Sequence, residues 1–480
     1  MSLIELPYQA DISQRFAHFK HLEWSMLFDS CQQERFDWFS SLPSKTVTLK
    51  SINVITQKSY SKEQNLLETT TINEDIFTYL NKFEFDDTHP QNLPFTGGWL
   101  GYLSYDLAQA ELNDKQPNNK DSFNTTLEQL GLNDLAQADI IDKQPNKNHS
   151  FNTPLAQLGL YDWACINDHK LKKSYLWFNC SDSKQLKIEH ILSAELKLPE
   201  LKSNEHNTFN FDWKNLTTKT NYINNVESIL AYILEGDCYQ TNYTQCWESK
   251  IPDLDSFVLY QSRKQKCPTP FSGYIVTPEL VLASHSPEAF ISIKDNQIDT
   301  YPIKGTTPRS DDPIEDALLK TKLACSAKDR AENIMITDLL RNDLSKTAIA
   351  GSVKCPEICK VYSYSNVHHL VSHVSATLNS AKYSIVDVLK HAFPGGSITG
   401  APKKRAMQII DELEDQSRSL YCGSMFALSC NKQLHSNILI RSFIYFEQTL
   451  RCYAGGGIVM DSDPQSEYQE SLSKVSILKD

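Results

Sequence analysis

Residues 281–306 read Val-Leu-Ala-Ser-His-Ser-Pro-Glu-Ala-Phe-Ile-Ser-Ile-Lys-Asp-Asn-Gln-Ile-Asp-Thr-Tyr-Pro-Ile-Lys-Gly-Thr. Short apolar and β-branched runs, separated by turns that contain Pro, Asp or Asn, predict three strands here. These strands are expected at 281–284, 289–293 and 297–303. A further hairpin is predicted at 438–446 and 450–454, whereas residues 222–234 have the apolar spacing of a helix. Helices that alternate with β-hairpins predict the α+β class.

Charge and composition limit the functions that the chain can have. It has 480 residues, a net charge of −12 and a pI near 5.6, and its basic residues are scattered, which excludes a nucleic-acid or anionic-membrane surface. No apolar stretch approaches the roughly 18 residues of a transmembrane helix, and residues 1–7 lack a signal-peptide pattern. Twelve cysteines without a Cys-x-x-Cys pair indicate reduced thiols. We therefore expect a soluble, cytoplasmic protein.

The length predicts more than one region. A polar stretch at 201–207 separates an N-terminal region, 1–205, from a C-terminal region, 206–480. The N-terminal region contains a tandem duplication, because the segment that starts at Leu107 recurs from Leu135 with a period of 28 residues. Both copies are polar and rich in Asn, so the sequence predicts an extended surface excursion at about 107–162.

Two pairs of carboxylates have helical spacing. Asp463 and Pro464 form a helix start, which places Glu467 and Glu470 on one helix face, and Asp329 and Glu332 repeat the spacing. Either pair alone is more often a solvated helix face than a metal site.

Cationic and glycine-rich segments are candidates for binding an anion. Arg441 lies inside the predicted apolar strand at 438–446, where an unpaired guanidinium would be costly, so a carboxylate clamp is the functional interpretation. Lys474 follows Glu470 by one turn, which fits a second cation or a solvated ion pair. Gly455-Gly456-Gly457 is expected to follow a strand, either as an oxyanion-binding loop or as a tight turn. Gly395 and Gly400 have phosphate-loop spacing, but Ala401 replaces the required lysine, so ATP binding is rejected.

Five motifs occur in a fixed order along the C-terminal half. They are Ser286-Pro-Glu288, Tyr301-Pro-Ile-Lys-Gly-Thr306, Asp329-Arg-Ala-Glu332 running into Thr337-Asp-Leu-Leu-Arg-Asn-Asp343, Phe393-Pro-Gly-Gly-Ser-Ile-Thr-Gly-Ala-Pro-Lys403, and Gln465-Ser-Glu-Tyr-Gln-Glu470. In this order they resemble the chorismate-utilising enzymes, the family of the anthranilate, isochorismate and aminodeoxychorismate synthases. The resemblance implies two stacked antiparallel sheets flanked by helices, with the active site in the cleft between them.

The resemblance also implies a role for each motif residue. Glu332 and Glu470 match direct Mg²⁺ ligands, with Asp329 and Glu467 behind them through water, which suits a hard cation that prefers oxygen. Glu288 matches the general acid and Lys304 a nucleophile. The residues implied to contact substrate are Gln240, Thr306, His369, Ser397, Tyr421, Arg441, Gly455, Gly457 and Lys474.

Within this family, a lysine at position 304 resembles the aminodeoxychorismate synthases, which implies an enzyme of the transaminase class that aminates chorismate with ammonia on the way to p-aminobenzoate and folate. Anthranilate synthases typically carry alanine there, and isochorismate synthases carry a lysine where this chain has Gln240. The chain lacks a glutaminase motif, so a separate glutamine amidotransferase subunit is expected as its partner. Residues 22–30 resemble a strand that lines a tryptophan pocket, although their alternation also fits core packing. The alternatives are an anthranilate synthase component and a non-catalytic regulatory subunit.

Overall fold

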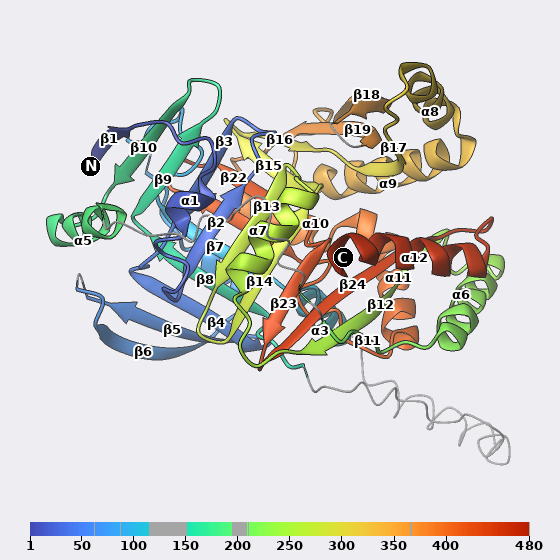
Figure 1. The fold of residues 1–480 in the computed structure, drawn as a ribbon, viewed down its shortest axis with the longest axis horizontal. Coiled ribbons are helices and arrows are strands. Elements are labelled where there is room, and N and C mark those ends of the chain that lie inside the picture. Colours follow the sequence, from blue (N-terminus) through green and yellow to red (C-terminus); the bar gives the residue numbers. More distant parts are fainter. Residues whose placement is uncertain are drawn as a thin grey trace, which may run out of the picture.

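The computed structural model describes residues 1–61, 63–86, 88–114, 151–193, 209, 211–364 and 367–479. Within these residues the chain forms two twelve-stranded sheets, and every strand pair in them is antiparallel (Figure 1). The sheets pack against each other, since one hydrophobic core joins Met26, Ile275 and Leu282 of the first sheet to Leu100 and Met425 of the second. The predicted α+β fold of two stacked antiparallel sheets is confirmed.

The first sheet runs in the order β1-β10-β9-β3-β2-β13-β14-β23-β24-β12-β11, with β20 paired to β12. Its strands are β1 (Ser2–Leu6), β2 (Ser25–Asp29), β3 (Phe36–Ser40), β9 (Trp163–Asp168), β10 (Lys173–Phe178), β11 (Lys214–Asn215), β12 (Gln240–Lys250), β13 (Phe271–Val276), β14 (Leu280–Ser286), β20 (Gly400–Ala401), β23 (Ser442–Phe446) and β24 (Thr449–Ile458).

The second sheet runs in the order β17-β19-β16-β15-β22-β21-β7-β8-β4-β5-β6, with β18 paired to β19. Its strands are β4 (Lys45–Ser51), β5 (Val54–Tyr60), β6 (Leu66–Asn73), β7 (Gly98–Leu103), β8 (Ala156–Tyr161), β15 (Ala289–Lys294), β16 (Gln297–Thr300), β17 (Ile303–Pro308), β18 (Lys354–Ser363), β19 (Val367–Thr377), β21 (Ser424–Ser429) and β22 (Leu434–Asn437).

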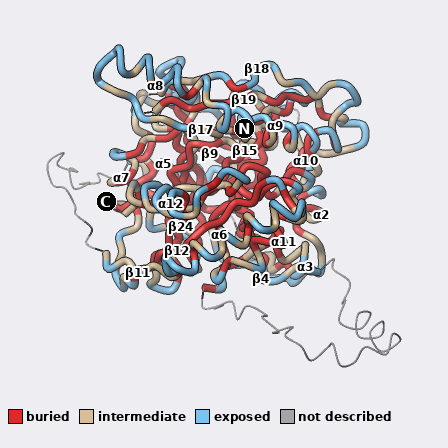
Figure 2. Tube along the Cα trace, turned by 90° about the vertical axis from the view of Figure 1, so that its right-hand side faces the viewer, coloured by how far each residue is buried: buried red, intermediate tan, exposed pale blue. Residues whose placement is uncertain are grey.

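Helices cover the outside of the sheets. They are α1 (Ser13–Phe16), α2 (Ile76–Leu80), α3 (Tyr105–Asp114), α5 (Asp182–Ser193), α6 (Lys219–Leu234), α7 (Ser256–Lys266), α8 (Pro313–Cys325), α9 (Ala327–Ser345), α10 (Ile385–Ala392), α11 (Lys403–Leu413) and α12 (Pro464–Lys479), with a 3₁₀ turn, η2, at Gly396–Ile398. In Figure 2 the central strands are buried along most of their length, and exposed backbone gathers at the periphery. No helix of the described residues is long and apolar enough to cross a membrane.

Strands from both regions of the sequence share each sheet. In the first sheet β2 pairs with β13, where Met26 lies opposite Ile275. In the second sheet β7 pairs with β21, where Gly101 lies opposite Phe426. Close approach of the sheets requires a glycine at Gly273, because a Cβ there would lie 2.5 Å from Met425 Sδ. The predicted boundary at 205/206 lies outside the described residues.

The segment at about 107–162 was predicted to be a surface excursion. This prediction is wrong at both ends of the segment, where the chain forms a helix and a buried strand. Residues 105–114 form α3, and residues 156–161 form β8, which pairs with β7 on one side and β4 on the other. Leu158 is fully buried, and the Tyr161 hydroxyl donates to the Trp24 carbonyl at 2.7 Å. The polar composition of the repeat concealed a short run of strand-forming residues in its second copy. Residues 115–150 lie outside the described residues.

Three local expectations also differ from the structure. The strand predicted at 438–446 begins only at Ser442, the strand predicted at 297–303 is interrupted at Tyr301 and Pro302, and Gly455–Gly457 lie inside β24 instead of following it. Arg441 precedes β23 with φ +51°. The predicted helix at 222–234 is confirmed as part of α6.

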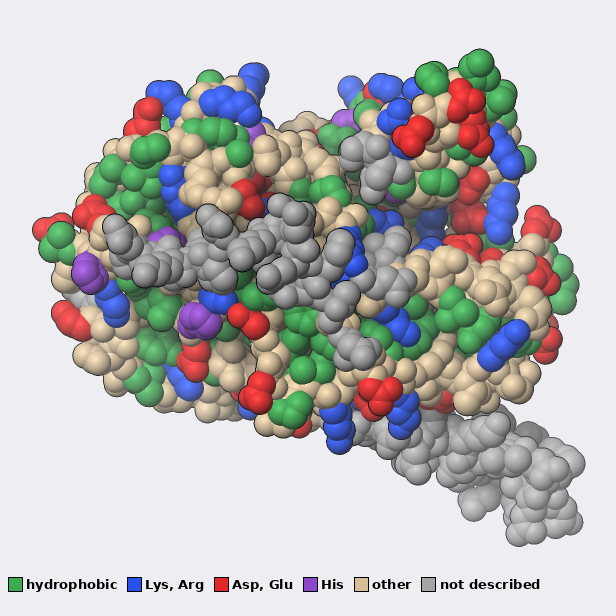
Figure 3. All heavy atoms as spheres, in the orientation of Figure 1, with side chains coloured by type: hydrophobic (Ala, Val, Ile, Leu, Met, Phe, Trp, Pro, Cys, Tyr) green, Lys and Arg blue, Asp and Glu red, His purple; other side chains and the backbone are tan. Residues whose placement is uncertain are grey.

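Two helix starts fix the carboxylates of the site. The Asp463 carboxylate accepts a hydrogen bond from Ser466 N at 2.8 Å, which caps α12 as the Asp-Pro pair predicted. Ser326 caps α9 in the same way, accepting from Asp329 N at 3.3 Å. α12 packs on β24 of the first sheet and α9 packs on β17 and β19 of the second (Figure 1). Both helices contribute carboxylates to one cleft. Figure 3 shows the surface hollowed between the lobe around α8 and the body below it, with acidic and basic side chains along the hollow.

Candidate active site

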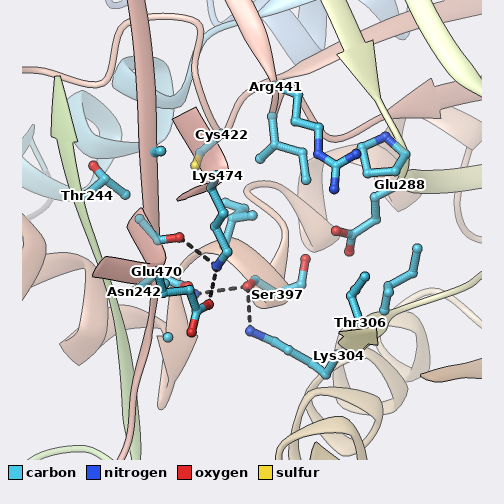
Figure 4. Close-up of a pocket in the computed structure, with 18 of the residues that line it drawn as sticks. Asn242, Thr244, Glu288, Lys304, Thr306, Ser397, Cys422, Arg441, Glu470 and Lys474 are labelled. Carbon is cyan, nitrogen blue, oxygen red and sulfur yellow. Dashed lines mark hydrogen bonds and ion pairs between the residues drawn. The ribbon is translucent and has the colours of Figure 1, made fainter. Parts of the chain in front are cut away.

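A cavity of about 540 Å³ lies in this cleft and gathers nearly all the predicted site residues. Fourteen of the fifteen line it: Glu288, Lys304, Thr306, Asp329, Glu332, His369, Ser397, Tyr421, Arg441, Gly455, Gly457, Glu467, Glu470 and Lys474. Figure 4 shows Lys304, Glu288, Arg441 and Lys474 directed into this common space from different elements. Residues that lie up to about 180 positions apart in sequence therefore share one site.

Lys304 projects from β17 toward the η2 turn. Its Nζ donates a hydrogen bond to the Ser397 carbonyl at 3.3 Å. Burial lowers the pKa of Lys304, and this outweighs the opposing pull of the nearby Glu332 and Glu288 carboxylates. A larger fraction of the amine is therefore neutral than for a lysine in water, and only the neutral form has a lone pair for attack.

Glu288 sits in the turn between β14 and β15 and is only 7 % exposed. Its backbone is fixed on both sides: Glu288 N donates to Ser286 Oγ at 3.2 Å, and the Glu288 carbonyl accepts from Ile438 N at 3.1 Å. Burial raises the pKa of Glu288 to about 7, although a hydrogen bond from Ser397 and the charge of Lys304 act against it. A carboxyl that is still half protonated near neutral pH can serve as a proton donor.

Gly305 allows α9 to approach the catalytic strand. It has φ +85°, and a Cβ there would lie 2.9 Å from Asp329 Cβ. Any larger residue at 305 would therefore push Asp329 away from the strand. The next residue, Thr306, shares a hydrogen bond of 2.8 Å with His369 Nδ1 on β19. Burial and the charge of Arg441 lower the pKa of His369 to about 4, so the imidazole is neutral at pH 7.

Carboxylates and ammonium groups alternate along the wall that α9, α12 and β24 form. A Cβ on Gly456 would lie 3.2 Å from Glu467 Oε2 and 3.7 Å from Glu470 Oε1, so the small residue lets both carboxylates reach the strand. Lys474 pairs with Glu470 at 2.6 Å and donates to the Gly455 carbonyl at 2.9 Å. Lys328 lies 3.9 Å from Glu467.

The pKa values of these carboxylates reflect crowding. Burial raises the pKa of Glu467, and the neighbouring Glu470 charge adds to this. Burial also raises the pKa of Glu332, with contributions from Asp329 and Glu467. Burial acts in the same direction on Glu470, but the adjoining Lys474 brings its pKa below the usual value. The carboxylates therefore repel one another in one partly dehydrated space.

The fit of this wall to a metal ion depends on its donors. In the part of the chain that the structure describes, no three His, Cys, Asp or Glu residues stand close enough together to hold one ion. The four carboxylates nevertheless line one cavity and offer only hard oxygen donors. Gly456 has no side chain to separate Glu467 from Glu470. Such a donor set fits Mg²⁺, provided that Glu470 exchanges its contact with Lys474 for the ion.

Arg441 lies in the cavity, but its backbone is not in the strand that was predicted. Instead, the backbone of Arg441 itself lies in the left-handed region, and His285 N donates to the Arg441 carbonyl at 3.0 Å. Its Nη1 donates to Cys267 Sγ at 3.5 Å, which leaves the rest of the guanidinium facing the cavity (Figure 4). The argument from burial in an apolar strand was therefore wrong, but the side chain still lies in the site.

Gln240 is the predicted residue that lies behind the cavity wall. It is buried at the start of β12, and neither its Nε2 nor its Oε1 has a hydrogen-bond partner among the described residues. A Cβ on Gly457 would lie 2.6 Å from Gln240 Nε2 and 3.4 Å from Lys304 Nζ, so the amide and the amine approach the same point.

Five polar or polarisable residues that line the cavity were not predicted from the sequence: Asn242, Thr244, Lys328, Cys422 and Tyr453. Asn242 and Thr244 follow Gln240 at intervals of two, and side chains two apart in a strand share a face. The alternation in β12 could therefore have revealed them. Nothing local in the sequence indicates Cys422 or Tyr453, which come from a turn and from β24.

Comparisons with known proteins agree with this geometry. Residues 118–480 match the family model of the chorismate binding enzymes. The whole chain is 36 % identical over 485 residues to aminodeoxychorismate synthase component 1 of Escherichia coli, of which it covers 98 %, and 35 % identical to the protein of the same name from Salmonella typhimurium, of which it covers 97 %. Anthranilate synthase component I from Streptococcus pneumoniae has the same fold, with a TM-score of 0.75 and 24 % identity, over 93 % of this chain and 92 % of the other. The chain belongs to the chorismate binding enzyme family.

Proposed function

We propose that this chain is component 1 of an aminodeoxychorismate synthase, which aminates chorismate with ammonia to 4-amino-4-deoxychorismate. Relatives with this name match the chain from end to end. The observation that carries the proposal is Lys304, a partly dehydrated amine beside a carboxyl with a pKa of about 7. The pair supplies a nucleophile and an acid in one cavity.

The proposed chemistry follows from these two groups. The neutral Lys304 amine attacks C2 of the ring while the double bonds shift and the C4–O bond breaks, and the Glu288 proton goes to the departing hydroxyl, which leaves as water. A covalent lysine adduct at C2 results. Ammonia then attacks C4, the double bonds shift back, and the C2–N bond to Lys304 breaks. Each step is an addition with loss of a leaving group, so no oxidant is needed.

Substrate binding requires positive charge, since chorismate is a dicarboxylate. Arg441 offers a guanidinium that can bind a carboxylate in a bidentate manner, and Lys474 offers an ammonium from α12 (Figure 4). His369 is neutral and can donate or accept a hydrogen bond without adding charge. Thr306, Ser397, Tyr421, Gly455 and Gly457 complete the proposed contacts.

We propose Mg²⁺ as the cofactor, held directly by Glu332 and Glu470 and through water by Asp329 and Glu467. When bound, the ion would neutralise part of the substrate's negative charge beside these carboxylates. The mutual repulsion of the carboxylates, which raises the pKa of Glu332 and Glu467, supports a cationic occupant.

Ammonia is proposed to come from a separate glutamine amidotransferase subunit, in keeping with the name component 1 of the relatives. We also propose a cytoplasmic location and the folate pathway as the context of the reaction. All twelve cysteines are free thiols, as a reducing compartment would keep them.

The deciding experiment incubates the purified chain with chorismate, Mg²⁺ and ammonium, and identifies the product. We expect 4-amino-4-deoxychorismate with ammonium, and none with glutamine until an amidotransferase partner is added. Anthranilate as the product would instead identify an anthranilate synthase, and no product with a correctly folded chain would identify a non-catalytic subunit.

A second cavity supports a further proposal, that the chain binds tryptophan. This aromatic cavity, of about 500 Å³, is lined by Phe28 and Asp29 of β2, by Trp38 of β3, and by Tyr301 and Tyr364. The indole would pack on the aromatic rings, and Glu34 is available to the amino group. Calorimetric titration with tryptophan checks this: binding that Phe28→Ala abolishes is expected. No heat of binding in the wild-type chain would leave residues 22–30 as core packing only.

A further inference from the structure

Ser397 connects the two reactive groups of the site. Its carbonyl accepts from Lys304 Nζ at 3.3 Å and from Asn242 Nδ2 at 2.9 Å (Figure 4). Its side chain lies close enough to Glu288 to act on the pKa of that carboxyl. The position of this one residue therefore determines where the amine lies and also affects the carboxyl. Ser397 belongs to a single 3₁₀ turn, η2, which has no side-chain cap of its own.

Asn242 holds this turn from the neighbouring strand. Besides the bond from its side chain to the Ser397 carbonyl, its backbone N–H donates to the Thr399 carbonyl at 2.8 Å. Asn242 thus forms hydrogen bonds with the residues on both sides of Ile398.

The buried ion pair of Glu414 and Arg418 contacts both Asn242 and the η2 turn. Arg418 donates from Nη2 to the Asn242 carbonyl and from Nη1 to the Ile398 carbonyl, both at 2.9 Å. Glu414 accepts from Arg418 Nε at 2.9 Å and from Nη2 at 2.7 Å, and its Oε1 also accepts from Thr244 N and Thr244 Oγ1, each at 2.9 Å. Among the described residues, the side-chain hydrogen bonds that this pair makes outside itself go to β12 and to the η2 turn.

The pair is not part of the cavity and is almost inaccessible, with side chains 1 % and 4 % exposed. Burying two charges is costly, and apolar residues of similar volume often stabilise a fold as well or better. A role in stability alone therefore does not account for the pair, whereas fixing two chain segments at a defined distance does.

We propose that Asn242 and the Glu414–Arg418 pair are positioning residues, which hold Ser397 so that its carbonyl directs the Lys304 amine. This inference rests on the proposed function for its kinetic consequences, but its structural content does not depend on it. Removing the Asn242 amide should leave substrate binding nearly intact, since the cationic groups remain, and slow the step in which Lys304 attacks.

The test variant is Asn242→Leu, which keeps the shape of the side chain and removes its donor. With ammonium as the nitrogen source, we expect kcat to fall at least tenfold while KM for chorismate changes less than about threefold, because positioning acts on the transition state more than on binding. The rate of adduct formation on Lys304 without ammonia should fall by the same factor as kcat.

The matched control is Asn431→Leu. Asn431 is also buried and its Nδ2 donates to the Pro90 and Leu93 carbonyls at 2.8 and 2.9 Å, but it lies outside the cavity. Its loss should lower the melting temperature without changing kcat. For the ion pair, the double variant Glu414→Leu with Arg418→Met removes both charges at once, so that neither is left unpaired, and should reproduce the kcat defect.

Crystal structures of the wild type and Asn242→Leu decide the structural part without reference to activity. We expect Lys304 Nζ to move beyond hydrogen-bond distance from the Ser397 carbonyl in the variant. An unchanged Lys304–Ser397 contact, a wild-type kcat, or a loss confined to KM would each overturn the positioning role. A wild type that yields no aminodeoxychorismate would overturn the proposed function instead, and the structures would still decide the inference.

Discussion

The two cavities of this molecule share two wall residues, Pro287 and Ile303, yet differ in chemistry. One cavity receives carboxylates from α9 and α12 and an amine from β17. The other is lined mainly by strands and loops, with Phe28 stacked on Trp38 at 5.0 Å and Trp38 against His435 at 5.1 Å.

Charged groups are present in the aromatic cavity too, but two of them are neutralised by partners. Lys264 holds Asp29 at 2.5 Å, and Arg35 binds Asp168 at 2.8 Å. In the catalytic cavity, by contrast, Lys304 donates to a carbonyl and ion-pairs with no carboxylate among the described residues. The stacked sheets therefore provide the space of both cavities, whereas α9, α12 and β17 bring carboxylates and amines together in one of them.

The largest effect is expected for Lys304→Ala. Loss of the nucleophile should lower ammonium-dependent turnover by about two to four orders of magnitude. The matched control is Lys294→Ala, which removes an amine from the aromatic cavity and should leave turnover unchanged. Similar losses in both variants would mean that the two cavities are not functionally distinct.

The second largest loss of turnover is expected for Glu288→Gln. Since the protonated acid is the proposed working form, wild-type kcat should fall as the pH rises above about 7. The variant should lose most of its activity, and its remaining activity should not fall over this pH range.

The same variant also tests stability. Because the folded-state pKa of Glu288 is raised, this group contributes stability at low pH that is lost as the pH rises from 4.5 through about 7, in total roughly 3 kcal/mol. The variant should therefore gain stability relative to wild type between pH 4.5 and 8 in urea titrations, whereas a constant difference would contradict the raised pKa.

A smaller loss is expected for Glu470→Gln, which keeps the shape of a proposed Mg²⁺ ligand and removes its charge. Turnover at a fixed Mg²⁺ concentration should fall roughly tenfold to a hundredfold, with partial recovery at higher Mg²⁺. Glu34→Gln removes a carboxylate from the aromatic cavity and should not change the Mg²⁺ dependence. Wild-type turnover that persists in a chelator would rule out the metal.

The smallest effect is expected for a deletion that removes none of the described residues lining either cavity. Removing residues 123–150 excises one 28-residue period and leaves 115–122 to join α3 to Phe151, a link that can span about 27 Å when extended. Activity and melting temperature should stay nearly unchanged.

The comparison deletion, of residues 135–162, also removes 28 residues but places Glu128 where Ala156 is buried and Asn133 where Tyr161 donates to Trp24. A buried carboxylate and a lost aromatic ring should cost on the order of 5 kcal/mol. Equal stability of the two deletions would show that β8 tolerates either copy of the repeat.

Local patterns in the sequence predicted the α+β class, whereas the stacked sheets and most of the cavity followed from the resemblance of the five ordered motifs to the chorismate-utilising enzymes. Local patterns failed where long-range pairing decides the structure. β8 looked like part of a polar repeat because its burial depends on β4 and β7, which are distant in the chain. Arg441 was expected in a strand because a positive φ in a non-glycine residue has no signal in apolar alternation. The hydrogen bonds of Asn242 with Ser397 and with Arg418 likewise join segments more than 150 positions apart.

The central claim is that Lys304 forms a covalent bond with the substrate. The most direct measurement is peptide mass spectrometry of the wild-type chain after incubation with chorismate and Mg²⁺ in the absence of ammonia. We predict an adduct on the peptide that contains Lys304, which disappears when ammonium is added and product forms. Product formation without any adduct on Lys304, together with an active Lys304→Ala variant, would contradict the account.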